Sequence, residues 1–502
     1  MSNSNASSPA TSTASASRTW FRQRSTTVLA AVAGALGALL LGPGSLRAET
    51  AAASATADIS GVLIPDDKPS TSPARTLLVV PQALTATLAL PVRGGFLLND
   101  RVHVYERLVD IFFNDARTFG VYPMLKLETG LPTGVGLRLV HKNLFGSGAR
   151  LGIGADYGGE SRNRLEGSLR SPAFAGGLAR ARVGGGWLRQ PNAAFFGIGD
   201  QDLSATGDGA RDLPARAPFA VATKFGQDVT HAELAAELDP AGPLFAAVST
   251  AYFQRAFRDT PAAGGGDAND PGVPPSPQAL GSTDVRFDTA TLTGWDQGSK
   301  LSYSELQLGW NSLTVANPFV SLATPSSGTK VVVFAGLARG VAGSNARYSR
   351  YGVDAFRYFD LYQGDRVLIL RGRLEGVDGA DERIPFTDLP RLGGPTLLRG
   401  YARDRFRDRV AVLASLEYRY PIWSRLSGFL FADAGRVLPD LKEAGRTALS
   451  PQLLRPSGGA GLEVIQVDNV LMRAQVAGSP EGVFLQFALG PVYRLPTHNY
   501  RI

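Results

Sequence analysis

Toward the end of the chain, three charged side chains have a spacing that could bury an ion-paired arginine. Arg399 lies in a segment without strand periodicity, whereas Glu417 and Asp433 lie on two successive segments that alternate between apolar and polar residues. In the segment 410–422 the apolar side chains share one face of a strand and Glu417 lies on the other. Because a buried guanidinium needs a carboxylate partner, we expect the loop to fold back so that Glu417 and Asp433 clamp Arg399.

The loop that carries this arginine has glycines where a tight backbone is needed. Gly393 and Gly394 precede Arg399, and Gly400 and Tyr401 follow it. Glycine adopts positive φ without the steric penalty of a Cβ, so these positions suit a segment folded into a confined interior. We expect the segment from Arg399 to Tyr401, with its two acidic partners, to act as a latch that fixes the loop tip. An ordinary ion pair in a polar interior is the alternative interpretation.

From Phe119 onward the sequence alternates between apolar and polar residues in short segments separated by turns. The chain has 58 Gly and 32 Pro, and only 19% of its residues are charged, which is typical of a turn-rich β-protein. Sixteen strands are predicted. They begin near Phe119, Val135, Gly148, Ser161, Gly177, Gly226, Leu244, Lys300, Gly328, Ala346, Asp365, Arg409, Gly428, Pro456, Val470 and Gly482.

The lengths of the segments between these strands alternate as well. The long segments 190–225, 259–299 and 379–408 all follow odd-numbered strands, and bacterial outer-membrane barrels have short periplasmic turns and long extracellular loops. Strands with one apolar and one polar face can span a membrane only as a closed barrel. We therefore predict an all-β fold: a 16-stranded antiparallel transmembrane β-barrel over residues 118–493, with a short N-terminal helix and an inward-folded sixth extracellular loop.

Two short motifs strengthen this interpretation. Leu398-Arg399-Gly400-Tyr401 and Phe431-Ala432-Asp433-Ala434-Gly435 resemble motifs of the BamA/TamA-type superfamily of outer-membrane assembly and secretion barrels, also called bacterial surface antigens. The family carries the first motif in the sixth extracellular loop and the second on the thirteenth strand. The resemblance covers roughly residues 100–493. It implies a location in the outer membrane of a Gram-negative bacterium and a function in inserting or translocating polypeptides there.

The resemblance also implies a weakly paired seam between the first and the last strand. In this chain the seam would join residues 119–129 to residues 483–493. The residues expected at the seam are Tyr122, Leu125, Leu485, Phe487 and Gly490. Gly490 and the proline after it weaken ladder pairing, which fits a labile seam and equally fits a plain strand end.

The expected partners follow from the same resemblance: outer-membrane lipid, lipopolysaccharide, and a polypeptide client or a separate periplasmic partner. Family members usually carry periplasmic polypeptide-transport-associated domains, each with two helices and three strands. Residues 49–98 are rich in Pro, Ala and Thr and lack that pattern, so we predict a periplasmic linker and a family member without these domains. The alternative function is a passive pore, or a structural or lipid-handling barrel without protein-transport activity.

The ends of the chain carry three further predicted segments. Residues 1–48 have the organisation of a signal peptide, because arginines precede the apolar run 27–41 and the small residue Ala48 follows it. A transmembrane anchor is the alternative, although the run is shorter than the roughly 20 residues that span a bilayer. Apolar side chains at helical spacing predict an amphipathic helix over residues 99–117, and residues 494–502 form a C-terminal tail.

Composition argues against several other functions. The formal net charge is +7 for the whole chain, but the residues that follow Ala48 include 47 basic and 44 acidic side chains and carry only +3. We therefore expect no nucleic-acid partner. There is no cysteine, and the four histidines lack metal-ligand spacing. No nucleotide-binding or nucleophile-elbow motif occurs. We therefore expect no metal, no cofactor and no enzymatic activity.

Two other segments carry expectations of their own. The mixed-charge run 403–409 is expected to be a solvated part of the loop; contact with lipopolysaccharide phosphates is the alternative, since arginine suits phosphate. Phe195 and Phe196, at the end of a predicted strand, are expected to lie in an aromatic girdle at the membrane interface.

Overall fold

In the computed structural model the structure describes residues 111–126, 134–158, 162–204, 211–239, 242–260, 281–315, 325–362, 364–423, 426–447, 452–466 and 469–489, with residues 81 and 450 in addition. The predicted signal peptide 1–48, the linker 49–98, most of the helix 99–117 and the tail 494–502 therefore lie outside the described residues.

Most of the described chain forms one large sheet of 17 strands. From β1 to β19, successive long strands pair antiparallel in the order of the sequence. The long strands are β1 (Phe119–Lys126), β2 (Gly134–Leu144), β3 (Ala149–Tyr157), β4 (Asn163–Arg170), β5 (Ala179–Phe195), β6 (Thr223–Leu238), β7 (Leu244–Arg258), β9 (Ser299–Asn311), β10 (Gly328–Gly340), β11 (Arg347–Tyr362), β12 (Arg366–Asp378), β15 (Val410–Trp423), β16 (Leu426–Leu438), β17 (Arg455–Gln466), β18 (Asn469–Ser479) and β19 (Gly482–Leu489). The remaining strand, β8 (Gly281–Ser282), pairs parallel with β6.

The predicted strand starts agree closely with this arrangement, since each lies within three residues of the start of an observed strand. The predicted N-terminal helix ends earlier than expected. Ile111 and Phe112 are helical, but Phe113 already forms a β-bridge with Gly120. The side chain of Asn114 accepts hydrogen bonds from the backbone N–H groups of Thr118 and Phe119, which turns the chain into β1 instead of continuing the helix to residue 117.

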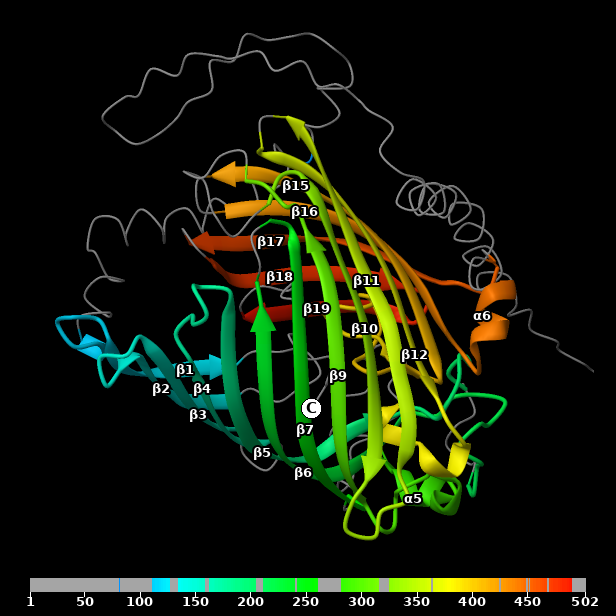
Figure 1. The fold of residues 1–502 in the computed structure, drawn as a ribbon. Helices are drawn as coiled ribbons and strands as arrows, with labels where there is room; N and C mark the ends of the chain where they lie inside the picture. The colour runs from blue at the N-terminus through cyan, green and yellow to red at the C-terminus, as the bar shows by residue number, and fades with distance from the viewer. Residues whose placement is uncertain are drawn as a thin grey trace, which may run out of the picture.

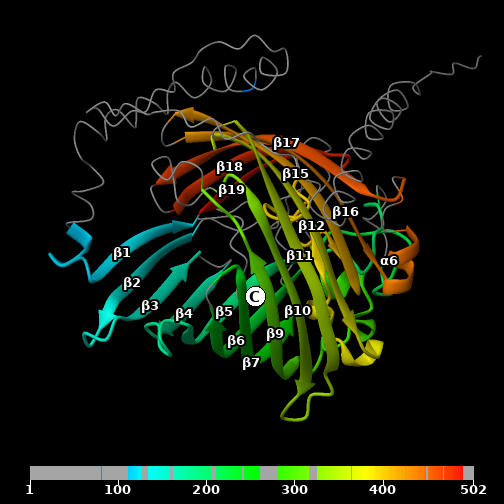
Figure 2. The same cartoon turned by 45° about the horizontal axis from the view of Figure 1, so that its top comes forward.

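The sheet curves round on itself, so that β15–β19 come to face β5–β7 across a central space (Figures 1 and 2). Among the described residues no backbone pairing joins β1 to β19. No helix in the described part of the chain is both long enough and apolar enough to cross a membrane.

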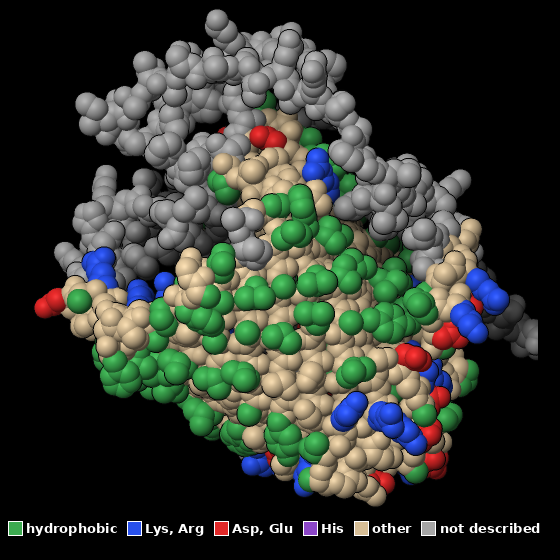
Figure 3. All heavy atoms as spheres, in the orientation of Figure 1, with side chains coloured by type: hydrophobic (Ala, Val, Ile, Leu, Met, Phe, Trp, Pro, Cys, Tyr) green, Lys and Arg blue, Asp and Glu red, His purple; other side chains and the backbone are tan. Residues whose placement is uncertain are grey.

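The two faces of the sheet have the reverse of the usual polarity of a water-soluble protein. In β9, Leu306 and Leu308 are 50% and 55% exposed on the outer face, whereas Glu305 and Gln307 are buried on the inner face. The same holds in β10, where Val333 and Leu337 are more than half exposed. Figure 3 shows the resulting apolar belt across the outside of the strands, with the charged side chains toward the edges of this face. Period-two alternation produces this separation, because successive side chains of a strand point to opposite faces.

The three long loops meet at one end of the sheet, which we call the long-loop end. They are the segments between β5 and β6, between β7 and β9, and between β12 and β15. Aromatic rings from these loops and the adjoining strand ends pack together there, for example Phe257 against Phe386 with ring centroids 4.9 Å apart. Phe195 and Phe196 are buried in this region, at 1% and 6% exposure, so the expectation that they form an exposed interfacial girdle is wrong. The loops that cover them could not be placed from local alternation alone.

Candidate functional site

The loop between β12 and β15 forms a hairpin that reaches across the inner face of the sheet. Its two short strands are β13 (Arg391–Leu392) and β14 (Phe406–Arg407), which pair antiparallel. Beyond them the tip is closed by backbone hydrogen bonds from Gly393 N–H to the Leu397 carbonyl, at 3.0 Å, and from Gly394 N–H to the Tyr401 carbonyl, at 3.1 Å. Leu398 is completely buried. The structure therefore places the predicted Gly393-Gly394 turn at the neck of the hairpin.

Two glycines of the hairpin occupy positions that a larger residue would disturb. Gly393 has φ of +110°, and a Cβ there would lie 2.2 Å from the carbonyl oxygen of Ala402. Gly400 has φ of +94°, and a Cβ there would lie 2.9 Å from Ser457 Cβ and 3.0 Å from the carbonyl oxygen of Gly478. The tip therefore lies directly against β17 and β18, and a glycine next to the arginine permits this approach.

Arg399 is 2% exposed and its guanidinium contacts both of the carboxylates that the sequence pairs with it. It makes two parallel hydrogen bonds to Asp433, from Nε to Oδ2 at 2.8 Å and from Nη2 to Oδ1 at 2.7 Å. Nη1 donates to Oε2 of Glu417 at 2.7 Å. The backbone N–H of Arg399 also donates to Asp433 Oδ2 at 3.0 Å. This is the bidentate geometry that makes an arginine–carboxylate pair strong and directional.

Two further groups complete the arginine site, and sequence reasoning missed both as partners. The hydroxyl of Ser415 accepts from Arg399 Nη2 at 3.0 Å, and it lies opposite Asp433 in the register of β15 and β16. The ring of Phe431 lies with its centroid 3.7 Å from the guanidinium carbon, which adds a cation–π contact. Period-two spacing could have found these residues, because Ser415 and Phe431 lie two positions before Glu417 and Asp433 respectively.

A second buried arginine extends the network along the inner face. Arg473 on β18 donates to Glu417 Oε2 at 2.5 Å and to Glu463 Oε1 at 3.1 Å. Its guanidinium carbon lies 3.6 Å from the ring centroid of Phe429. Glu417 thus bridges Arg399 and Arg473, so the hairpin and four strands, β15 to β18, share one network of alternating charges. Charges of both signs in close contact offset the cost of burying each of them.

Tyr401, the last residue of the predicted latch, is also buried. Its hydroxyl donates to the carbonyl of Pro456 at 3.1 Å, and its ring lies edge-on to that of Phe406 at 5.1 Å. Burial raises the pKa of Tyr401, so the hydroxyl remains a proton donor. On the opposite side of the tip, Arg371 on β12 donates to the carbonyl of Thr396 at 3.2 Å. The tip is therefore held from β12 as well as from β15–β18.

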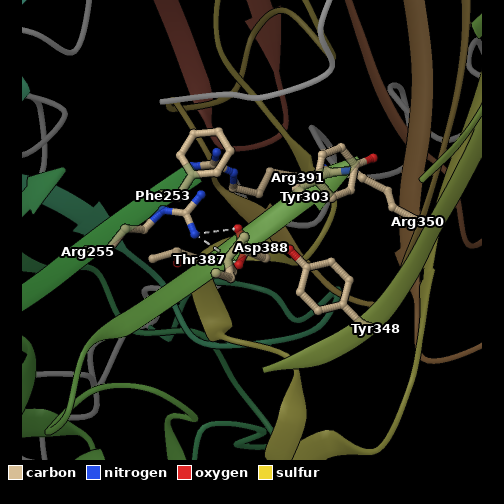
Figure 4. Close-up of a pocket in the computed structure, with 9 residues that line it drawn as sticks. Phe253, Arg255, Tyr303, Tyr348, Arg350, Thr387, Asp388 and Arg391 are labelled. Carbon is tan, nitrogen blue, oxygen red and sulfur yellow. Dashed lines mark hydrogen bonds and ion pairs between the residues drawn. The ribbon is translucent and has the colours of Figure 1, made fainter. Parts of the chain in front are cut away.

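At the base of the loop a small polar cavity lies beside a second ion pair. Arg255 on β7 points toward Asp388, and its Nη1 lies 2.9 Å from Oδ1 of that residue (Figure 4). The cavity is lined by Phe253, Arg255, Leu301, Tyr303, Tyr348, Arg350, Thr387, Asp388 and Arg391. This pair ties the start of the loop to the wall across from the latch.

The mixed-charge run after the latch is not solvated, contrary to the prediction. Arg405, Arg407 and Asp408 are each at most 2% exposed. Asp408 accepts two hydrogen bonds from Arg216 of the β5–β6 loop, at 2.9 and 2.6 Å. A dense run of charges usually indicates a solvent-facing segment. Here Asp408 and Arg405 find partners in distant segments, at Arg216 of the β5–β6 loop and at Glu481 of the β18–β19 turn.

Arg407 is a buried arginine of a different kind from Arg399. Among the described residues no carboxylate lies within ion-pair distance of it; it donates to the carbonyl of Phe386 at 3.1 Å. Its guanidinium lies 5.4 Å from the ring of Phe195. Burial, with the neighbouring charge of Arg391, lowers the pKa of Arg407 to about 9. The charged form of Arg407 is therefore less favourable in the folded protein than in the unfolded chain.

Replacing Arg407 by methionine is accordingly expected to leave the free energy of unfolding unchanged or to increase it by about 1 kcal/mol, since a buried charge can often be replaced by an apolar side chain without loss of stability. Because the folded pKa is lowered, wild-type stability should rise as pH increases above about 9, and Arg407→Met should remove that part of the rise. Chemical denaturation between pH 7 and 11 checks both statements. A loss of several kcal/mol in the variant would contradict this account.

Gly400→Ala is expected to destabilise the protein by roughly 1–3 kcal/mol, through positive φ and the close approach to β17 and β18. Gly343→Ala is the matched control: φ there is +88°, and a Cβ would meet no atom within 4 Å. The control should lose only about 1 kcal/mol of backbone strain. Denaturation midpoints of the two variants measure the difference. Equal losses would mean that the tip does not lie against the sheet as described.

The predicted seam residues lie on the two edge strands of the described sheet. Tyr122 pairs with Arg138 of β2, while Leu485 and Phe487 pair with Val476 and Ala474 of β18. The side chain of Leu125, and Gly490 altogether, lie outside the described residues. The structure therefore places Tyr122, Leu485 and Phe487 on the expected edge strands, without showing a contact between the two strands.

Comparison with known proteins finds a family model that matches part of the chain. Residues 283–467, from the turn before β9 to the end of β17, match the Omp85 superfamily domain. Over this region the chain is similar to Omp85 superfamily proteins. The matched region contains the whole hairpin and both carboxylates that hold Arg399. The predicted resemblance to BamA/TamA-type barrels is thus confirmed.

Two solved structures match this chain. The crystal structure of BamA from Haemophilus ducreyi lacking POTRA domains 1-3 has a TM-score of 0.50 and 15% identity, covering 74% of this chain and 70% of that chain. CdiB from Acinetobacter baumannii has a TM-score of 0.41 and 11% identity, covering 76% of this chain and 57% of that chain. No curated protein sequence matches this one. The likeness to BamA shows the fold only, a mostly antiparallel β-structure with few helices.

Proposed function

We propose that this chain is an outer-membrane β-barrel that inserts or translocates polypeptides. The observation that carries the proposal is the position of the latch: the hairpin held by Arg399, Glu417 and Asp433 lies within the region that matches the Omp85 superfamily domain. In the proposed barrel, loop 379–409 is the inward-folded sixth extracellular loop, and the latch keeps its tip inside. The activity requires no metal and no cofactor.

The proposed barrel has 16 strands and closes between β1 and β19. Support comes from the antiparallel order of the long strands, with the two-residue β8 as an addition at the long-loop end. The apolar outer face supports a lipid environment, because exposed Leu, Val and Trp side chains on one face and buried Glu and Gln on the other are unfavourable in water. Closure would place Tyr122, Leu485 and Phe487 near the seam.

The proposed location is the outer membrane of a Gram-negative bacterium, with the long-loop end outside the cell. Lipid would surround the apolar belt, and lipopolysaccharide would surround the outer rim. A polypeptide client would be received from the periplasm, alone or from a separate periplasmic partner. These partners follow from the family and from the parity of the loops.

The test of this proposal is a quantitative outer-membrane proteome of a strain that lacks the protein. Loss of several unrelated barrels together would support an assembly factor, and loss of one exported protein would support a dedicated translocator. An unchanged proteome, with complementation as the control, would contradict polypeptide handling. It would favour the alternative of a passive pore or a structural or lipid-handling barrel, which conductance measurements would then examine.

A further inference from the structure

A second anchor of the hairpin lies outside the latch, at Arg405. This side chain is 1% exposed and contacts two segments that are distant in the sequence. Nε lies 3.0 and 2.9 Å from the two carboxylate oxygens of Glu481, and Nη2 lies 2.7 Å from Oε1. Nη2 also donates to the carbonyl of Gln201 at 2.7 Å. The guanidinium carbon lies 4.5 Å from the ring centroid of Phe406.

The carboxylate partner of Arg405, Glu481, lies next to an edge of the described sheet. Glu481 lies in the tight turn between β18 and β19, and β19 is an edge strand of the described sheet, because its only backbone partner there is β18. An edge strand with one ladder of hydrogen bonds is held more weakly than a strand with two neighbours. An ion pair to the turn therefore restrains the strand that most needs external support.

Other contacts between the hairpin tip and the same pair of strands reinforce this arrangement. Gln475 on β18 donates to the carbonyl of Pro395 at 2.9 Å and to Gln486 Oε1 on β19 at 2.8 Å. Gly400 packs against the backbone of Gly478. The loop thus touches β18 and β19 at the middle of the strands through Gln475 and at their turn through Arg405.

We propose that Arg405 and Glu481 are a positioning pair that couples the hairpin to the β18–β19 edge, independently of the Arg399 latch. This inference rests on the proposed function, because β19 is one edge of the proposed seam. Arg405 holds the turn in register, Gln201 fixes the guanidinium from the β5–β6 loop, and the edge strand is thereby kept in a single position for pairing. The latch fixes where the loop tip lies; this pair fixes where the last strand lies.

Glu481→Gln tests the pair, because it removes the charge and keeps the size of the side chain. Amide hydrogen exchange of purified full-length protein is expected to become at least about tenfold faster in residues 472–489, and to stay unchanged at the hairpin tip 393–401. Glu481→Asp, which keeps the charge, should restore part of the protection. Arg409→Gln is the matched control in the same loop, since its partner Asp381 is 83% exposed; it should leave residues 472–489 unchanged.

Unchanged exchange in residues 472–489 of folded Glu481→Gln would overturn the proposal, and so would equal acceleration over the whole sheet. If Glu481→Gln fails to fold, Arg405→Lys provides the second variant: it retains the charge but loses the fork, and the same region should exchange faster. This readout needs no client. A strain lacking the protein with an unchanged proteome would therefore refute polypeptide handling while leaving the coupling of the two residues to be judged separately.

Discussion

Arg399→Ala is expected to lower the free energy of unfolding by roughly 3–5 kcal/mol, the largest effect of any single substitution considered for this chain. The cause is the charge left behind. Asp433 would lose both bonds of a bidentate pair, and Glu417 would lose its hydrogen bond from Arg399 while keeping the one from Arg473. Both carboxylates are almost completely buried, so water cannot replace the lost donors. The measurement is the midpoint of denaturation in detergent, followed by gel mobility before and after heating.

Two variants separate the latch from a general effect of losing an arginine. Arg399→Lys keeps a positive charge but cannot make the parallel bonds to Asp433, so it should recover only part of the stability. Arg409→Ala removes an arginine of the same loop whose partner, Asp381, is 83% exposed, and should cost at most about 1 kcal/mol. If Arg399→Ala and Arg409→Ala had equal effects, the buried latch would be ruled out.

Leu306→Arg is expected to destabilise the membrane-inserted protein by about 2–4 kcal/mol and to reduce its amount in the outer membrane. Leu306 lies in the middle of β9, 50% exposed on the apolar outer face. In a bilayer this position faces hydrocarbon, where an arginine is poorly solvated. In water the same substitution would change stability by less than about 0.5 kcal/mol. The effect therefore reports which solvent surrounds the sheet.

Leu441→Arg is the control for this prediction. Leu441 is 48% exposed, close to the value for Leu306, but it begins the short helix α6 (Leu441–Thr447) outside the strands. Immunoblots of separated membranes, with urea resistance of the inserted fraction, compare the two variants. Equal behaviour of Leu306→Arg and Leu441→Arg would refute a lipid-facing belt.

Local sequence patterns predicted much of the fold and the centre of the site. Alternation placed the strand starts, because polarity with a period of two depends only on neighbouring residues. It also placed Glu417 and Asp433 on one face, and the need of a buried arginine for carboxylates then linked them to Arg399. Glycines at Gly393 and Gly400 indicated a tight turn, and both have positive φ.

What the sequence did not reveal depends on contacts between distant segments. Arg473 reaches Glu417 because of the register in which β15 to β18 pair. Alternation predicts which face of the sheet a side chain lies on, but it does not predict which residue of the neighbouring strand lies beside it. Arg405 and Arg407 were expected in solvent, because the density of charged residues is read from neighbouring positions in the sequence. The groups that bury them, such as Glu481 for Arg405 and the ring of Phe195 for Arg407, come from distant segments. The predicted helix ends early because the side chain of Asn114 accepts a hydrogen bond from the backbone N–H of Thr118.

The most direct test of the latch is cysteine labelling in intact cells, because the chain has no cysteine of its own that would react with the label. Thr396→Cys places the probe at the hairpin tip, and Asn345→Cys places one in the exposed turn between β10 and β11. We predict that a water-soluble maleimide labels Asn345→Cys quickly in every background, and labels Thr396→Cys quickly only when Arg399 is also replaced by alanine. Rapid labelling of Thr396→Cys with Arg399 intact would contradict a hairpin held inside the sheet.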